Sequence, residues 1–170
     1  LDNPIGIAPK SRVSPSYRKL SVPVGNNLLG RILDGLGNPI DGKGPIIDEE
    51  HYPVFNSPPD PLSRKEIINQ LTTGIRSIDG LLPIGYGQRV GIFSGSGVGK
   101  SILIGMIAKN TNARVNVIGL IGERGREVKE FIDRDLGEEG IKRSVIIVAT
   151  SDQAPFIRVK AALVATAIAE

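Results

Sequence analysis

The chain has 170 residues and a formal net charge of +3, and its 40% hydrophobic and 23% charged residues are typical of a single globular domain. The absence of cysteine excludes disulfides, thiol nucleophiles and cysteine-based zinc or iron–sulfur sites, and the single histidine excludes a histidine-rich metal site. Aromatic residues make up only 4%, which argues against a base-stacking surface for nucleic acid. No apolar run reaches the roughly 18 residues of a transmembrane helix and no secretory signal is visible, so we expect a cytoplasmic protein.

The first part of the chain is rich in turns and prolines. Residues 1–20 are polar and basic, and they predict a leading segment at the edge of a preceding domain. The apolar runs 21–24 and 28–33 are separated by a Gly-Asn-Asn turn and predict two short strands. Repeated prolines between residues 41 and 63 favour a linker, because proline restricts φ and removes a backbone donor.

From residue 64 onward the pattern changes to alternating helices and strands. A short helix capped by Thr72 or Thr73 is expected to run to Leu81. Three strand–helix units follow, with strands expected at 89–93, 115–121 and 144–150 and helices at 100–110, 125–136 and 154–170. Continuous apolar strands that alternate with helices predict an α/β fold with a parallel sheet covered by helices on both faces.

The strongest chemical signal is the segment 91–101, GIFSGSGVGKS, which joins a predicted strand to a predicted helix. This is the context that a phosphate-binding P loop requires. Glycines allow unusual dihedrals, so successive N–H groups can face one anion, and the helix N-terminus adds its dipole. We expect Lys100 to bind the β- and γ-phosphates and the Ser101 hydroxyl to ligate Mg²⁺. The expected nucleotide-binding residues are Ser96, Gly97, Val98, Gly99, Lys100, Ser101 and Ile102.

One position departs from the strict P-loop pattern, since Ser94 stands where glycine is usual. Serine is small, and the match of Gly99, Lys100 and Ser101 between a strand and a helix favours a P loop over a purely structural glycine turn. A dinucleotide-binding fingerprint fits less well, because Lys100 occupies the position of its third glycine.

A charged turn, GERGRE at residues 122–127, follows the second of these strands. Ligands of open parallel sheets bind beyond the carboxyl ends of the strands, so Glu123 would face the γ-phosphate if the two strands lie near each other. A carboxylate there can orient and activate the attacking water, and Arg124 can hold the loop or neutralise charge. The alternative is a helix N-terminus stabilised by Glu123, with an i,i+4 ion pair between Arg126 and Glu130. Spacing alone supports the two interpretations equally.

Several segments together resemble the flagellum-specific and type III secretion export ATPases, which are relatives of the catalytic β subunit of rotary ATP synthases. The resemblance is carried by residues 28–45, 58–67, 72–101, 119–132 and 148–170, and so covers nearly the whole chain. It implies a RecA-like P-loop NTPase core with a short β-rich N-terminal part, Mg-ATP hydrolysis and a homohexameric ring. It assigns residues 1–20 to the end of an N-terminal β-barrel or linker, and 21–170 to the N-terminal portion of the ATP-binding domain.

The resemblance also implies residue roles, cofactors and partners. Glu123 polarises the attacking water with Arg124 beside it, and Lys100 and Ser101 act in the P loop on ATP and Mg²⁺. The implied partners are further copies of the chain, a stator-like regulator, a stalk-like protein, and export substrates with their chaperones. These meet at the cytoplasmic face of a membrane export gate, without nucleic acid. The family's second aspartate, arginine finger and adenine pocket have no counterpart here, so we expect a truncated ATPase domain without turnover of its own.

Related functions share this core. The alternatives are an ATP synthase-type catalytic subunit, a V-type nucleotide-binding subunit and a virulence type III secretion ATPase, all of the same superfamily. Residues 94–101 and 125–128 fit an export ATPase better than a rotary synthase subunit. A ring-shaped RNA translocase would need an RNA-binding domain, which this sequence does not contain.

Overall fold

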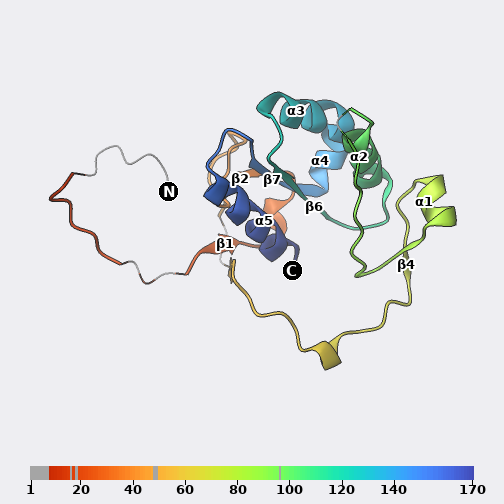
Figure 1. Ribbon diagram of the computed structural model, residues 1–170, viewed down its shortest axis with the longest axis horizontal. Helices are drawn as coiled ribbons and strands as arrows, with labels where there is room; N and C mark the ends of the chain where they lie inside the picture. The colour runs from red at the N-terminus through yellow and green to blue at the C-terminus, as the bar shows by residue number, and fades with distance from the viewer. Residues whose placement is uncertain (1–7, 16, 18, 48–49, 96) are drawn as a thin grey trace.

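The centre of the molecule is a three-stranded parallel sheet (Figure 1). The computed structural model describes residues 8–15, 17, 19–47, 50–95 and 97–170. The strand order is β2 (Ile32–Asp34), β7 (Ser144–Ala149) and β6 (Asn116–Ile121), and β7 runs parallel to both neighbours. The predicted α/β fold with a parallel sheet is therefore confirmed.

The central strand β7 is buried on both faces, as its continuous apolar sequence predicts. Successive side chains of a strand point to opposite faces of the sheet, so β7 contributes to two separate cores. The helix α5 (Pro155–Ala169) covers one face, and the helices that follow β6 cover the other (Figure 1). The first core contains Val145, Ile147 and Ala149 of β7, and the second contains Ile146 and Val148.

Most helices of the structure begin and end close to the residues predicted from the sequence. Both α2 (Lys100–Asn110) and α5 match the predicted spans to within one residue. The predicted helix 125–136 begins as α3 (Gly125–Glu130) and continues as a π-helical segment, η3 (Phe131–Leu136). The helical run ends at Leu136 as predicted, because Gly137 adopts a φ of 65°. A separate helix that the sequence did not predict, α4 (Gly137–Lys142), begins at that glycine. Among the described residues, no helix combines the length and the apolar character needed to cross a membrane.

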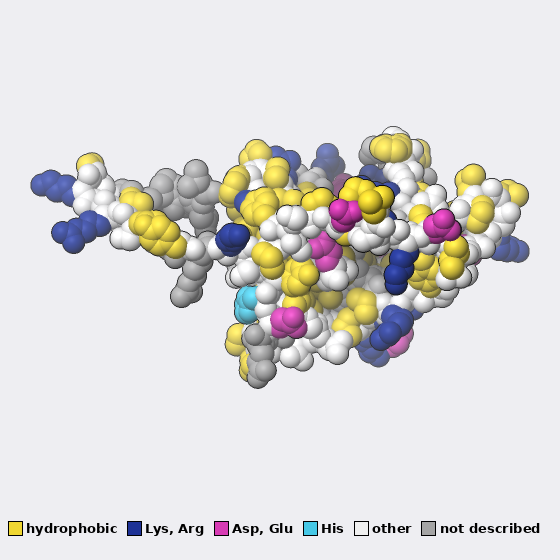
Figure 2. All heavy atoms as spheres, turned by 90° about the horizontal axis from the view of Figure 1, so that it is seen from below, with side chains coloured by type: hydrophobic (Ala, Val, Ile, Leu, Met, Phe, Trp, Pro, Cys, Tyr) yellow, Lys and Arg dark blue, Asp and Glu magenta, His cyan; other side chains and the backbone are white. Residues whose placement is uncertain are grey.

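The β-rich N-terminal part packs onto the main sheet. The strands β1 (Ser21–Pro23) and β3 (His51–Pro53) form an antiparallel pair, and η1 (Asn26–Leu28) is a 3-10 turn where a strand was expected to begin. β2 joins the parallel sheet beside β7. The described residues between 8 and 19 form no helix or strand and extend away from the body, with basic side chains near the far end (Figure 2). The core beneath α5 includes Val22, Leu28, Leu33 and Val54.

A buried ion pair holds the turn that follows β2. The Asp41 carboxylate accepts hydrogen bonds from Arg31 Nε at 2.7 Å and from the Ile32 backbone N–H at 3.1 Å. The Arg31 guanidinium also donates to the Gly44 carbonyl at 2.6 Å. The Arg31 side chain holds the pKa of Asp41 well below its usual range. Residues 31–44 therefore form a closed loop against the sheet edge.

The predicted strand at 89–93 is wrong for this structure. None of the described segments pairs with these residues, and a strand forms only where a neighbour takes its backbone hydrogen bonds. The side chain of Phe93 is 96% exposed.

Two short elements precede this segment. The strands β4 (Gln70–Leu71) and β5 (Ile84–Gly85) form an antiparallel pair, and a 3-10 turn, η2, spans Pro61–Ser63.

The helix α1 (Arg76–Leu81) lies between β4 and β5 and ends at the predicted residue. Its start differs from the prediction, because Ile75 occupies the N-cap position. Thr73 does not cap the helix. Instead, the carboxylate of Asp79 within the helix accepts hydrogen bonds from the Thr73 N–H, the Thr73 hydroxyl and the Gly74 N–H at 2.7–2.9 Å. These three donors lower the pKa of Asp79.

The helix α2 approaches η3 closely at Gly105. A Cβ atom on Gly105 would lie 2.9 Å from the Asp135 Cβ and 3.0 Å from the Asp135 carbonyl oxygen. We expect Gly105→Ala to destabilise the fold by about 1–3 kcal/mol, because backbone must move to admit the methyl group. Denaturant unfolding of the variant measures this effect.

Gly80→Ala in α1 is the matched control for this prediction. Nothing lies within 4 Å of the methyl group that the change would add, so helix propensity should stabilise this variant by up to about 1 kcal/mol. Equal stabilisation by the two substitutions would contradict the close contact between α2 and η3.

Candidate active site

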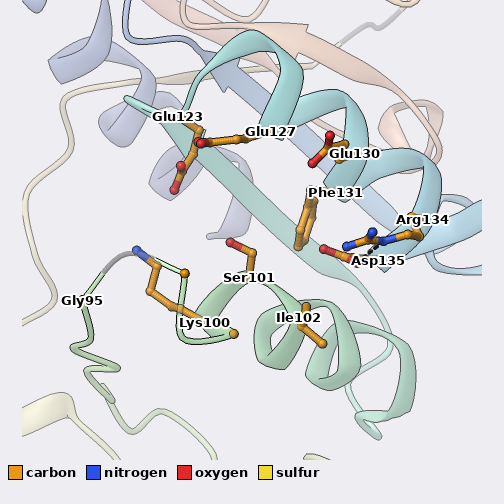
Figure 3. Close-up of a pocket in the computed structure, with 12 residues that line it drawn as sticks. Gly95, Lys100, Ser101, Ile102, Glu123, Glu127, Glu130, Phe131, Arg134 and Asp135 are labelled. Carbon is orange, nitrogen blue, oxygen red and sulfur yellow. Dashed lines mark hydrogen bonds and ion pairs between the residues drawn. The ribbon is translucent and has the colours of Figure 1, made fainter.

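A pocket of about 330 Å³ lies where the N-terminus of α2 faces α3 and η3 (Figure 3). One wall comes from the glycine loop and the first turn of α2, and the other comes from the end of β6 and the helical segment after it. The lining residues are Gly95, Gly97, Gly99, Lys100, Ser101, Ile102, Glu123, Glu127, Glu130, Phe131, Arg134 and Asp135. The pocket therefore joins the two motifs that the sequence singles out.

The glycine loop has the backbone that a phosphate cradle requires. Gly97 and Gly99 adopt φ values of 77° and 93°, a region that disfavours side chains, and Gly99 is the N-cap of α2. The first hydrogen bond of α2 runs from the Leu103 N–H to the Gly99 carbonyl at 2.9 Å. The N–H groups of residues 100–102 precede this bond and remain available for an anion at the positive end of the helix dipole.

The predicted nucleotide-binding residues do not all reach the pocket. Gly97, Gly99, Lys100, Ser101 and Ile102 line it. The side chain of Val98 is 68% exposed and is not part of the lining, so its contribution is limited to backbone. Ser96 lies outside the described residues.

Glu123 lies on the wall opposite the P loop, where the sequence argument places it. Figure 3 shows the side chains of Glu123 and Glu127 across the pocket from Lys100 and Ser101. Glu123 is half-buried, and within the described part of the chain its carboxylate has no hydrogen-bond or ion-pair partner. A half-buried carboxylate without a protein partner remains available to orient a water molecule beside a phosphate.

The helix-capping interpretation also applies, but to neighbouring residues. The Glu127 carboxylate accepts a hydrogen bond from the backbone N–H of Arg124, the N-cap residue of α3, at 3.3 Å. The Arg124 side chain is 78% exposed and does not line the pocket, and its nearest carboxylate is Glu127 at 3.8 Å. The expected pair between Arg126 and Glu130 is present at 3.9 Å. Glu127 stabilises the helix start, and Glu123 is left out of that arrangement.

Five lining residues outside the P loop were missed as site candidates, namely Glu127, Glu130, Phe131, Arg134 and Asp135. The last four follow Glu127 at intervals of three, four, seven and eight residues, so all five lie on one face of a helix. This spacing is visible in the sequence, although only the structure shows that the face is turned to the P loop. The Arg134 Nε lies 3.3 Å from the Asp135 Oδ1 at the far end of the pocket.

Comparison with known proteins identifies the family. Residues 74–170 match the ATP synthase alpha/beta family, nucleotide-binding domain. The chain belongs to this family. Within it, the flagellum-specific ATP synthase of Bacillus subtilis is 55% identical over 96% of this chain and 37% of its own length. The type 3 secretion system ATPase of Xanthomonas euvesicatoria is 54% identical over 98% of this chain and 38% of its own length.

Solved structures of type III secretion ATPases show the same fold. A prototypical ATPase from the type III secretion system of pathogenic bacteria superimposes with a TM-score of 0.84 at 45% identity, over 89% of this chain and 44% of that one. The assembled ATPase EscN of enteropathogenic E. coli, in complex with its central stalk EscO, gives 0.82 at 46% identity, over 88% and 37%. The resemblance to export ATPases is confirmed. The chain spans 37–44% of the length of these relatives.

Proposed function

We propose that the complete protein is an ATPase that powers flagellar, type III protein export. This chain carries its phosphate-binding loop and the carboxylate that activates the attacking water. The observation that carries the proposal is that Lys100, Ser101 and Glu123 line one pocket from opposite walls. The flagellar and type III secretion relatives support the export assignment. They support a synthase-type or V-type subunit less well.

Each residue then has a defined role in phosphoryl transfer to water. The N–H groups at the start of α2 and the Lys100 ammonium bind the phosphate oxygens and stabilise the charge that develops on them. The Glu123 carboxylate orients the attacking water and accepts its proton. Arg124 acts on the loop, since its backbone N–H and side chain engage Glu127.

The pocket fits a magnesium ion that arrives with the nucleotide. Among the described residues, no three acidic or histidine side chains form a metal cage. Mg²⁺ prefers few protein oxygens together with substrate phosphates and water, and the Ser101 hydroxyl beside the P loop supplies such an oxygen. When bound, the ion neutralises charge on the β- and γ-phosphate oxygens.

The proposal extends to assembly and location. The EscN structures include an assembled ATPase and a complex with a central stalk, and we infer a hexamer with a stalk-like partner for the complete protein. A stator-like regulator and export substrates with their chaperones would meet it on the cytoplasmic side of the membrane export gate. We propose that steady turnover requires the complete protein and that this chain binds nucleotide without sustained hydrolysis.

Metal removal and RNA addition test this function in the complete protein. Hydrolysis of ATP should fall to background in EDTA and return with Mg²⁺, because phosphate charge is otherwise not neutralised.

RNA should not stimulate hydrolysis of ATP by the complete protein. A salt-sensitive stimulation by RNA would instead identify a translocase. Export is measured in a strain that lacks the gene, where the wild-type gene should restore secretion of substrate and a turnover-deficient variant should not.

A further inference from the structure

The loop that carries Glu123 joins β6 to α3 and has few packing contacts of its own. Gly122 adopts a φ of 79°, a region that favours glycine. Among the described residues, no atom outside the adjoining residues lies within 4 Å of the place that a Cβ would take at Gly122 or at Gly125. Hydrogen bonds rather than packing therefore set the conformation of residues 122–125.

Two backbone hydrogen bonds hold the first half of this loop. The Gly122 N–H donates to the Ala149 carbonyl at 2.7 Å, and the Ser151 N–H donates to the Glu123 carbonyl at 2.9 Å. The last register pair of β6 and β7 is Ile121 with Ala149. Both bonds therefore continue the pairing of these two strands by a short distance beyond the sheet.

The second half of the loop is held by a side chain. The Arg124 N–H donates to the Glu127 Oε2 at 3.3 Å, and the Glu127 Oε1 lies 3.8 Å from the Arg124 Nη1. The Arg124 N–H and the Glu123 carbonyl belong to one planar peptide group. This peptide group is thus held from both sides, by the Ser151 N–H and by the Glu127 carboxylate, and its orientation determines where the Glu123 side chain points.

We propose that Glu127 is a positioning residue for Glu123 and that it acts through the Arg124 N–H. Glu127 occupies the third position of α3, where glutamate or glutamine commonly accepts a hydrogen bond from the N-cap N–H. Figure 3 shows Glu123 and Glu127 on the same wall of the pocket. Loss of the bond releases the peptide group next to Glu123, so the carboxylate moves away from the attacking water. This inference rests on the proposed function, in which Glu123 orients that water.

Glu127→Ala in the complete protein removes the acceptor of this bond. A misplacement of about 1 Å costs on the order of 10²-fold in rate, so we expect kcat to fall about 10- to 100-fold. KM for ATP should change less than about threefold, because the P loop is unchanged. The matched control is Glu139→Ala in α4, which removes an exposed carboxylate that accepts from Lys142 at 2.6 Å outside this pocket and should leave kcat unchanged.

Two conservative variants distinguish the hydrogen bond of Glu127 from its negative charge. Glu127→Gln keeps an oxygen acceptor and loses the charge, so kcat should stay within about threefold of the wild-type value. Glu127→Asp keeps the charge but is one methylene shorter, so it should lose the bond and lower kcat as Glu127→Ala does. The reverse order, with Glu127→Asp active and Glu127→Gln impaired, would overturn the inference. Both variants keep a polar side chain at the helix start, so they decide the question if Glu127→Ala fails to fold.

A double-mutant cycle shows whether Glu127 acts through Glu123. In a Glu123→Gln background, Glu127→Ala should cause no further loss of kcat, because the carboxylate that Glu127 positions is already gone. An equal loss in both backgrounds, or a wild-type kcat in Glu127→Ala alone, would contradict the positioning role.

The cycle separates this inference from the proposed function. Full turnover in Glu123→Gln would remove the assigned role of Glu123 and with it the basis of the inference. Loss of turnover in Glu123→Gln with normal turnover in Glu127→Ala would reject only the positioning role of Glu127.

Discussion

Lys100→Ala is expected to abolish ATP hydrolysis and to weaken nucleotide binding by about 10- to 100-fold. The ammonium group is the only positive side chain on the P-loop wall of the pocket, within the described residues. A hydrogen bond to a charged group contributes about 1.5–3 kcal/mol, which corresponds to the expected loss of affinity. The loss of turnover should be larger, since charge on the phosphate oxygens grows in the transition state.

Calorimetric titration of the complete protein with a non-hydrolysable ATP analogue measures this affinity. Lys129→Ala is the control, because Lys129 is an exposed residue of α3 that pairs with Asp133 at 3.3 Å and does not line the pocket. Nucleotide affinity of Lys100→Ala equal to that of Lys129→Ala would contradict the assignment of the P loop.

Glu123→Gln is expected to lower kcat by about 10²- to 10⁴-fold while nucleotide binding is retained. The substitution keeps the shape and hydrogen-bonding capacity of the side chain but removes its ability to accept a proton. Because Glu127 and Glu130 also line the pocket, removal of one negative charge should keep the affinity for an anionic nucleotide the same or increase it slightly. This combination separates a catalytic carboxylate from a structural one.

Single-turnover hydrolysis together with equilibrium binding tests the second prediction. Glu138→Gln in the first turn of α4 makes the same chemical change at an exposed position outside this pocket and should retain normal kcat. A Glu123→Gln variant with wild-type kcat would contradict the predicted catalytic role of Glu123.

Local sequence was sufficient for the elements whose signals are local. The span of α2 follows from a glycine N-cap and from the apolar helical face of residues 100–110. The positive φ values of Gly97 and Gly99 follow from the need to direct N–H groups at one anion. The buried strand β7 follows from its sequence, in which Ser144 is followed by five consecutive apolar residues.

Sequence was insufficient where an element depends on a distant partner. Residues 89–93 have an apolar strand sequence but no hydrogen-bonded neighbour among the described residues, so they form no strand. The edge strand β2 lies more than a hundred positions from β7 along the chain, and no local pattern indicates that the two are paired. Strand pairing over such separations is decided by the packing of the whole core.

The sequence by itself determined the composition class, the P loop and the helices, because these depend on residue type and short-range spacing. Only the tertiary structure shows that Glu123 lines the pocket of the P loop, and its catalytic role stays a prediction. It brings the end of β6 opposite the start of α2 and gives the capping role to Glu127 instead. The composition of the 170 residues indicates one domain without a cysteine or histidine site. The candidate site is instead a pocket between the P loop and the segment that begins at Glu123, about twenty positions further along the chain. Proximity across a sheet edge arises from strand order and packing, which spacing along the chain does not encode.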